Sequence, residues 1–211
     1  DAEDASSPNH LDIVAMNSAE NERVEFTRTT NPKSAAGNVE RWLIEVEAMM
    51  RETLVARAAE GVAHYAQVER VKWIVSHPGM LVLCGSQIYW TREVSEALST
   101  GGTAGLKKYE AQCTAQLADV VNMVRGKLTK MERKTVSALV TIDVHSRDVV
   151  SDMAAKGVSL TSDFEWLAQL RYDLDAEGIV QVSMINATKR HGYEYLGNSS
   201  RLVITPLTDR C

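Results

Sequence analysis

Several features that mark particular protein classes are absent or scarce in this chain of 211 residues. It has only three cysteines, Cys84, Cys113 and Cys211, which form no CxxC pair and no zinc-spaced cluster with histidine. The longest apolar run, "GMLVLCG", is far too short to cross a bilayer, and the acidic, polar N-terminus is unlike a signal peptide. We therefore expect reduced thiols, no metal site and no membrane partner.

The chain also has no excess of positive charge. The net charge is -5 and the pI is about 5.6, so no overall basic field attracts nucleic acid. Basic residues gather only in "RGKLTKMERK", where a docking patch is conceivable but a solvated junction between helices is the better interpretation. We therefore expect no nucleic-acid partner.

The common catalytic motifs are missing as well. No G-x-x-x-x-G-K-[ST], G-x-S-x-G or HExxH string occurs, and "GGTAG" is interpreted as a turn between two helices. The string "DVHSRD" offers one candidate, a small enzyme in which His145 acts as a general base beside a carboxylate. On a helix, however, Asp143 and Arg147 are four residues apart and would simply form an ion pair, which favours a structural role.

Most of the chain has the apolar period of an α-helix. From Asn38, a candidate N-cap, the segment through residue 67 predicts one long helix. Its apolar stripe consists of Val39, Trp42, Leu43, Val46, Met49, Met50 and Leu54. Further helices are predicted for "QVERVKWIVSHPG", "MLVLCGSQIYWTREVSEALSTGG", "LKKYEAQCTAQLADVVNMVRGKLT" and "TSDFEWLAQLRYDLDAEG". The segment "MERKTVSALVTIDVHSRDVVSDMAAKG" partly alternates like a strand, but its length favours a helix.

Strand patterns occur near both ends of the sequence. "LDIVAMN" and "RVEFTRT" each predict a short strand, while "IVQVSMIN" and "YEYLG" predict a β-hairpin joined by the polar connection "ATKRHG". The predicted fold is therefore mainly α, with a helical bundle followed by a small β-hairpin. The expected divisions are a partly extended lead-in over 1–35, a helical bundle over 36–178, the hairpin over 179–197, and the start of a further unit over 198–211.

Several long strings resemble one family closely. "HPGMLVLCGSQIYWTREVSEAL", "VRGKLTKMERKTVSALVTIDVHSRDVV", "DFEWLAQLRYDLD", "MINATKRHGYEYLGN" and "RLVITPLTDRC" resemble dynein heavy chains, of axonemal rather than cytoplasmic type. The match runs in order from about residue 38 to Cys211 and corresponds to the late part of the linker entering the first AAA+ module. Departures, such as Ser200 where the family often has Pro and "HPG" where "WPG" is frequent, blur the subtype and leave the family intact.

The resemblance implies a mechanical role. The linker is a helical lever across the AAA+ ring of the same heavy chain, and it bends and straightens as ATP is turned over. The implied partners are that ring, microtubules, and light and intermediate chains of the intact complex, in the cytoplasm and cytoskeleton of the ciliary or flagellar axoneme. The chain would end before the phosphate-binding loop, so we expect no ATP hydrolysis and no cofactor here, and ATP or ADP with Mg only in the intact motor.

One contact with nucleotide is implied within this chain. In the family, the segment matching Leu202, Val203, Ile204, Thr205 and Pro206 lies against the adenine of the nucleotide in the first AAA+ module. The same residues could equally be ordinary core of that module, and both interpretations stay open. A different class of function, an independent helical scaffold that docks a partner protein, is the alternative to the motor segment.

Overall fold

The structure is a computed structural model that describes residues 11–198. Its elements follow one another as β1 (Ile13–Asn17), β2 (Arg23–Thr30), the 3-10 turn η1 (Pro32–Ala35), α1 (Val39–Tyr65), α2 (Arg70–Ser76), α3 (Gly79–Arg125), α4 (Lys130–Ala155), α5 (Phe164–Leu167), β3 (Arg171–Leu174), β4 (Val180–Met184) and β5 (Ala187–Arg190). The mainly helical fold predicted from the sequence is confirmed, with two small antiparallel sheets beside the helices.

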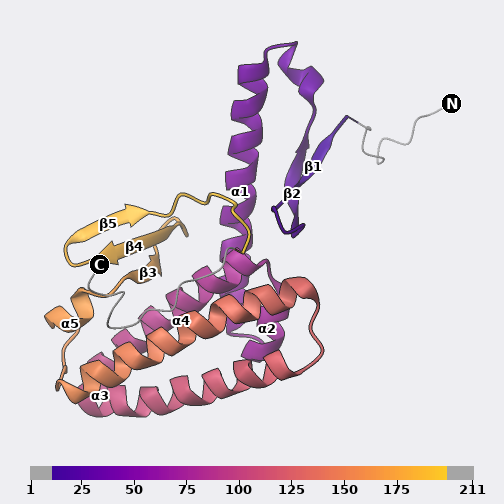
Figure 1. Cartoon of the computed structure of the whole chain (residues 1–211). Helices are drawn as coiled ribbons and strands as arrows, with labels where there is room; N and C mark the ends of the chain where they lie inside the picture. The colour runs from indigo at the N-terminus through magenta and orange to yellow at the C-terminus, as the bar shows by residue number, and fades with distance from the viewer. Residues whose placement is uncertain (1–10, 199–211) are drawn as a thin grey trace.

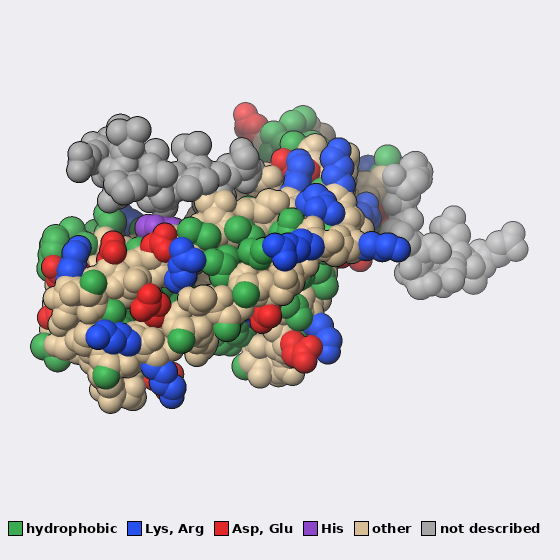
Figure 2. All heavy atoms as spheres, turned by 60° about the horizontal axis from the view of Figure 1, so that its bottom comes forward, with side chains coloured by type: hydrophobic (Ala, Val, Ile, Leu, Met, Phe, Trp, Pro, Cys, Tyr) green, Lys and Arg blue, Asp and Glu red, His purple; other side chains and the backbone are tan. Residues whose placement is uncertain are grey.

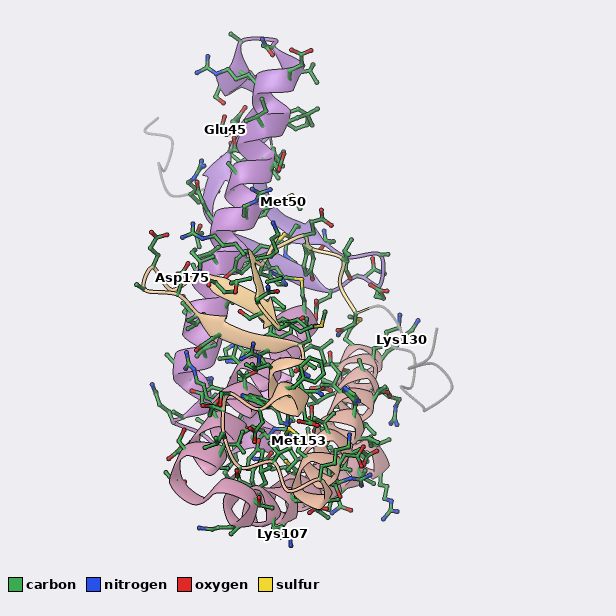
Figure 3. The ribbon with its side chains drawn as sticks, turned by 90° about the vertical axis from the view of Figure 1, so that its left-hand side faces the viewer. Glu45, Met50, Lys107, Lys130, Met153 and Asp175 are labelled. Atoms are coloured by element: carbon green, nitrogen blue, oxygen red, sulfur yellow. The ribbon has the colours of Figure 1, made fainter. Side chains whose placement is uncertain are left out.

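The helices form a body from which α1 projects as an arm (Figure 1). The β1–β2 hairpin runs beside the arm, whereas the three-stranded sheet lies against the body. Glu45 and Met50 lie on the arm above the body, Met153 lies among the body helices, and Lys107 marks the far end of the body (Figure 3). The lower part of α1 is therefore the connection between arm and body.

Local sequence explains how α1 and α4 begin. The side chain of Asn38 accepts a hydrogen bond from the backbone N–H of Arg41, as its N-cap position predicts. At the start of α4, Thr129 and Glu132 form a reciprocal capping box, with donor–acceptor distances of 2.7 and 3.2 Å. The ambiguous segment after residue 130 is thus a helix, as its length indicated, despite its run of β-branched residues.

The long element α3 is two helices that meet at a sharp turn. Gly102 has φ 53° and ψ -135°, a backbone conformation that a residue with a Cβ rarely adopts. Beyond this turn the chain folds back on itself, so Tyr109 in the second half reaches Glu93 in the first half at 2.8 Å. The interpretation of "GGTAG" as a turn between helices is confirmed. Together with α4, the two halves of α3 form a three-helix body.

The body has two separate apolar clusters. The far cluster lies toward the Gly102 turn and contains Trp90, Val94, Leu98, Leu106, Tyr109, Cys113, Val150, Met153, Ala154, Val158 and Trp166. The near cluster lies toward α2 and contains Trp73, Ile74, Val82, Leu83, Val120, Val136, Ala138 and Leu139. A third cluster joins α1 to both sheets and includes Leu54, Ile88, Val180 and Tyr193. Three of the four tryptophans are thus buried in apolar cores.

Two predictions near the C-terminal end were wrong. The helix expected over 161–178 stops after Leu167, and the strand β3 follows at Arg171–Leu174. All four residues of β3 pair with β4, and the Tyr172 N–H donates to Thr91 Oγ1 at 3.0 Å. These contacts outweigh the helical spacing of the apolar residues in this segment. The second hairpin strand is Ala187–Arg190, from the expected connection, and "YEYLG" forms no strand.

The surface is mixed in character. Acidic and basic side chains are interspersed over one face, with apolar side chains exposed between them (Figure 2). Within residues 11–198, no helix is both long and apolar enough to cross a membrane. The described cysteines, Cys84 and Cys113, are buried and form no disulfide.

Candidate functional site

Three distant parts of the chain meet at Glu22, in the turn between β1 and β2. Its carboxylate accepts a hydrogen bond from Gly79 N at 2.8 Å and another from the Tyr195 hydroxyl at 2.7 Å. Gly79 begins α3, so the carboxylate occupies the position at a helix N-terminus where negative charge is stabilised. Burial and the Glu22 carboxylate both raise the pKa of Tyr195, which keeps it a hydrogen-bond donor. We call these three residues the Glu22 clamp.

The end of the described chain is fixed beside the clamp. The buried Asn198 side chain donates to Thr135 Oγ1 of α4 at 2.6 Å. It also fills the space beside Gly79, where an added Cβ would lie 1.7 Å from Asn198 Nδ2. Any larger residue at position 79 would therefore have to displace the Asn198 side chain, which holds residue 198 against the starts of both α3 and α4.

The last turns of α1 are tied to the body by side chains, in a set of contacts that we call the α1 anchor. Trp73 Nε1–H donates to the carbonyl of Gly61 at 2.8 Å, and the Tyr89 hydroxyl donates to the carbonyl of Val62 at 2.7 Å. In addition, His64 Nδ1 and His77 Nε2 lie 2.9 Å apart, so one ring donates to the other. The arm thus has several hydrogen bonds to the body besides its apolar packing.

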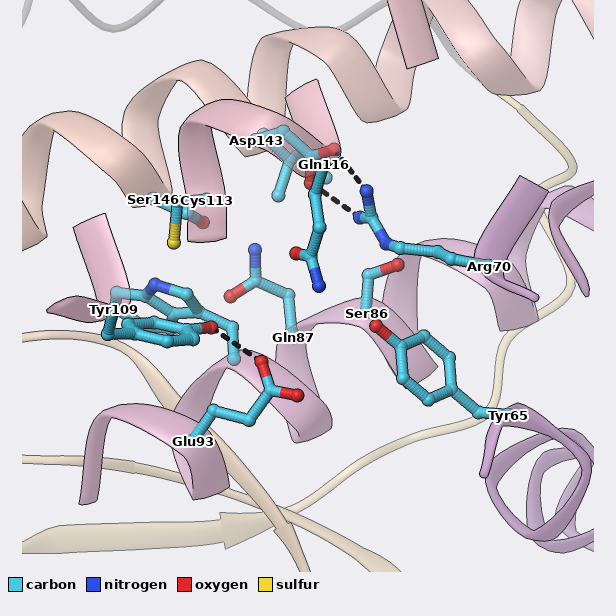
Figure 4. A pocket seen from close by; sticks show the side chains of 12 residues that line it. Tyr65, Arg70, Ser86, Gln87, Glu93, Tyr109, Cys113, Gln116, Asp143 and Ser146 are labelled. Atoms are coloured by element: carbon cyan, nitrogen blue, oxygen red, sulfur yellow. Dashed lines mark hydrogen bonds and ion pairs between the residues drawn. The ribbon is translucent and has the colours of Figure 1, made fainter. Parts of the chain in front are cut away.

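A polar layer separates the near and far apolar clusters of the body. It consists of Tyr65, Arg70, Ser86, Gln87, Glu93, Gln116, Asp143 and Ser146. Together with Trp90, Tyr109 and Cys113, which also belong to the far cluster, these residues line one small cavity (Figure 4). Along α4, for example, Leu139 belongs to the near cluster, Asp143 and Ser146 to the layer, and Val150 to the far cluster. Residues of α1, α2, α3 and α4 all contribute.

The strongest interaction in the layer joins α2 to α4. Two guanidinium nitrogens of Arg70 donate to the two carboxylate oxygens of Asp143 at 2.8 and 2.9 Å. Both side chains are largely buried, at 14% and 12% exposure. Burial on its own would lower the pKa of Arg70, but the charge and hydrogen bonds of Asp143 outweigh it and the net shift is upward. Arg70 therefore stays charged inside the body.

A second interaction joins the two halves of α3. The Tyr109 hydroxyl donates to a carboxylate oxygen of Glu93, and burial raises the pKa of the Glu93 carboxyl despite that hydrogen bond. Burial also raises the pKa of the neighbouring Cys113 thiol to about 11, so the thiol stays protonated at neutral pH. The layer is thus a set of hydrogen-bonding groups without an activated nucleophile.

The arrangement around His145 does not favour catalysis. The predicted ion pair between Asp143 and Arg147 is wrong, because Asp143 binds Arg70 and Arg147 binds Asp148 at 2.6 Å. Both carboxylates near His145 are therefore engaged by arginines. Among residues 11–198, no group of three or more His, Cys, Asp or Glu side chains is placed to hold a metal ion.

The adenine wall expected at Leu202, Val203, Ile204, Thr205 and Pro206 lies outside the described residues. What the sequence reasoning missed are the long-range polar pairs. Arg70 and Asp143 are 73 positions apart, and Glu22 and Tyr195 are 173 apart, so no local period could connect them. The sequence offers one signal for such a pair. Asp143 is a charged residue at a position where helical spacing between Leu139 and Val150 predicts a buried side chain.

Comparison with known proteins gives the family. Residues 3–61 match the family described as "Dynein heavy chain, N-terminal region 2". Over 202 residues, or 96% of the chain, the sequence is 52% identical to dynein axonemal heavy chain 12 of Mus musculus and 46% identical to dynein axonemal heavy chain 3 of Homo sapiens. Human dynein axonemal heavy chain 1 is 43% identical over 201 residues.

The chain belongs to the dynein heavy chain family. Within that family its sequence is that of an axonemal heavy chain, and it includes part of N-terminal region 2. The matched region spans only about 5–6% of the length of these relatives.

Proposed function

We propose that this chain is a force-transmitting linker segment of an axonemal dynein heavy chain. The observation that carries the proposal is the match of nearly the whole chain to heavy chains 12, 3 and 1, which are far longer proteins. The mechanical part of the proposal follows the linker resemblance of the sequence. A lever must be stiff and firmly joined at its ends, because a soft joint would absorb displacement.

The contacts of the chain support a stiff element. Close-packed apolar clusters resist compression, and the α1 anchor and the Glu22 clamp add directional hydrogen bonds where the arm, the body and the residue-198 end meet. The hairpin β4–β5 and strand β3 continue this network by backbone ladders. We infer that load entering at residue 198 reaches the arm without passing through a flexible connection.

We assign ATP binding and hydrolysis to the rest of the heavy chain. ATP or ADP with Mg would be bound and hydrolysed in the AAA+ ring, whereas this chain contains no phosphate-binding loop sequence. We keep the proposal that residues 198–211 begin the first AAA+ module and that Leu202–Pro206 form an adenine wall in the intact motor. The ring, microtubules, and light and intermediate chains are the proposed partners, in the ciliary axoneme.

The alternative of an independent helical scaffold has less support. An independent domain would not need to match, over 96% of its residues, a small part of proteins many times its length. A partner-docking role for the exposed apolar residues of the arm, Val39, Leu43 and Ile44, remains compatible with either function, since the long relatives contain much more chain that could cover them.

The proposal can be tested in an intact axonemal heavy chain that carries this segment. Trp73→Phe and Tyr89→Phe together remove two hydrogen bonds of the α1 anchor while keeping an aromatic ring at each position. We expect microtubule gliding to slow while ATP turnover in the absence of microtubules is retained, because force transmission is weakened and the ring is not. Lys107→Gln, at the exposed far end of the body, is the control. Equal gliding speeds for the double variant and the control would contradict the mechanical role.

A further inference from the structure

The polar layer contains buried polar atoms that have no hydrogen-bond partner among the described residues. These atoms are Ser86 Oγ, Trp90 Nε1 and Arg70 Nε. Ser86 is only 6% exposed and Trp90 only 8%, so bulk water does not solvate them. Buried polar groups in folded proteins are almost always hydrogen-bonded, either to protein or to an internal water molecule. Three unpartnered atoms around one cavity therefore indicate a ligand.

The cavity has the size of a water site. Ser86, Trp90 and Arg70 all line it, and the volume of the cavity is about 20 Å³. One bound water needs a cavity of roughly 10–15 Å³. The carboxamides of Gln87 and Gln116 point into the same space, and the Ser86 hydroxyl faces Arg70 (Figure 4). Small organic ligands occupy pockets of at least about 300 Å³, so they do not fit here.

We propose that the polar layer is a binding site for internal water. Arg70 Nε–H and Trp90 Nε1–H can only donate, so a water beside either group accepts a hydrogen bond from it. The Ser86 hydroxyl and the Gln87 and Gln116 carboxamides are the further partners that water bound in this cavity can use. The same donors exclude a metal cation, because Arg Nε–H and Trp Nε1–H have no lone pair with which to coordinate one.

The bound water links segments that make few direct polar contacts. Arg70 belongs to α2, Ser86 and Trp90 to the first half of α3, and Gln116 to its second half, while Asp143 of α4 is already paired with Arg70. Polar groups within an apolar helical interface can fix the register of the helices, as a buried Asn does in coiled coils. The water site thus sets how the two apolar clusters are aligned along the body.

The first test measures water directly. The Trp90 indole N–H gives its own signal in NMR spectra of the 211-residue chain, and we expect a nuclear Overhauser effect to water of the sign that marks a long residence time. The Trp73 indole N–H is an internal control, because it is fully buried and donates to the Gly61 carbonyl at 2.8 Å. A water effect at Trp90 and none at Trp73 supports the site; its absence at Trp90 overturns it.

The second test uses the sign of a stability change. If water is bound, Ser86→Ala removes one of its partners, and the folding equilibrium constant falls about five-fold relative to the control. If the cavity is dry, the same change removes an unsatisfied hydroxyl and raises that constant. Ser99→Ala is the matched control, because Ser99 is an exposed serine of the same helix and its replacement gives the same gain in helix propensity. A Ser86→Ala chain that is as stable as the control, or more so, contradicts the proposal.

Discussion

The two halves of α1 have the same apolar spacing but opposite surroundings. In the lower half, Leu54 is fully buried and Ala58 and Val62 are nearly so, packed with residues of α3 and of both sheets. In the upper half, Val39 and Leu43 are 61% and 53% exposed, although the sequence places them on the same stripe. Periodicity thus predicts that a stripe exists, whereas tertiary contacts decide which part of it is covered. The lower half belongs to the body and the upper half to the arm.

The sharpest contrast between body and arm should appear in their ion pairs. Asp143→Asn leaves the Arg70 charge largely buried without its partner, and we expect a loss of about 3–5 kcal/mol in unfolding free energy. Glu47→Gln breaks the exposed pair with Arg51 on the arm and should cost about 0–1 kcal/mol. Urea unfolding followed by circular dichroism measures both. Similar losses for the two variants would remove the distinction between buried and exposed pairs.

Truncating leucines tests the same contrast in apolar packing. Leu54→Ala creates a cavity at a fully buried site and should cost about 2–5 kcal/mol. Leu43→Ala, eleven positions earlier on the same helix, should change stability by less than about 0.5 kcal/mol. The comparison uses one chemical change in one helix, so differences in helix propensity cancel. A large loss at Leu43 would mean that the upper half is covered in solution.

The α1 anchor should contribute less than core packing. Trp73→Phe removes the N–H that binds the Gly61 carbonyl, and we expect a loss of about 1–3 kcal/mol, since the carbonyl is buried and the ring shrinks. Amide hydrogen exchange then reports where the loss falls. Exchange should accelerate in the last turns of α1 more than in α4, and a uniform acceleration throughout the body would argue against a localised anchor.

Acid should weaken the anchor by a still smaller amount. Burial, and then the electrostatic effect of His64, lower the pKa of His77 below its ordinary 6.5. The charge of Arg57 lowers this pKa a little further, and the charge of Glu60 acts in the opposite direction. The folded state therefore binds this proton less readily than the unfolded state, so stability is complete above about pH 6.5 and falls as the pH drops toward the lowered value. His77→Gln should flatten that part of the stability profile, measured by urea unfolding at several pH values. An unchanged slope would show that His77 does not carry it.

The sequence predicted the elements better than their partners. Helical spacing located α1, α2, both halves of α3 and α4, because each has an apolar stripe long enough to show its period. It also gave β1 and β2, whose alternation is flanked by turn residues. It failed at β3, where Arg171–Leu174 is too short for its period to be decisive and pairing with β4 determines the structure.

The candidate site was harder to predict for a physical reason. Asp143 was recognised as a notable residue, but a partner four positions away on the same helix was assigned in place of Arg70. Local rules give the partners that a residue can reach along one helix, and they say nothing of a second helix that packs across it. The unpartnered Ser86 hydroxyl could not be found from the sequence at all, because a serine within a helix is usually exposed or bonded to its own backbone.

The position of the Glu22 clamp has a consequence for how the molecule bears a pull. Glu22 is near one end of the described chain and Tyr195 near the other, yet a single carboxylate joins them to the first residue of α3. We expect tension applied between the arm and residue 198 to pass through this carboxylate as well as through the α1 anchor, whereas the tip of the body at Gly102 lies outside that path. Inserting residues at the Gly102 turn should therefore leave force transmission unchanged. Glu22→Asp, which shortens the side chain by one methylene group, should reduce it.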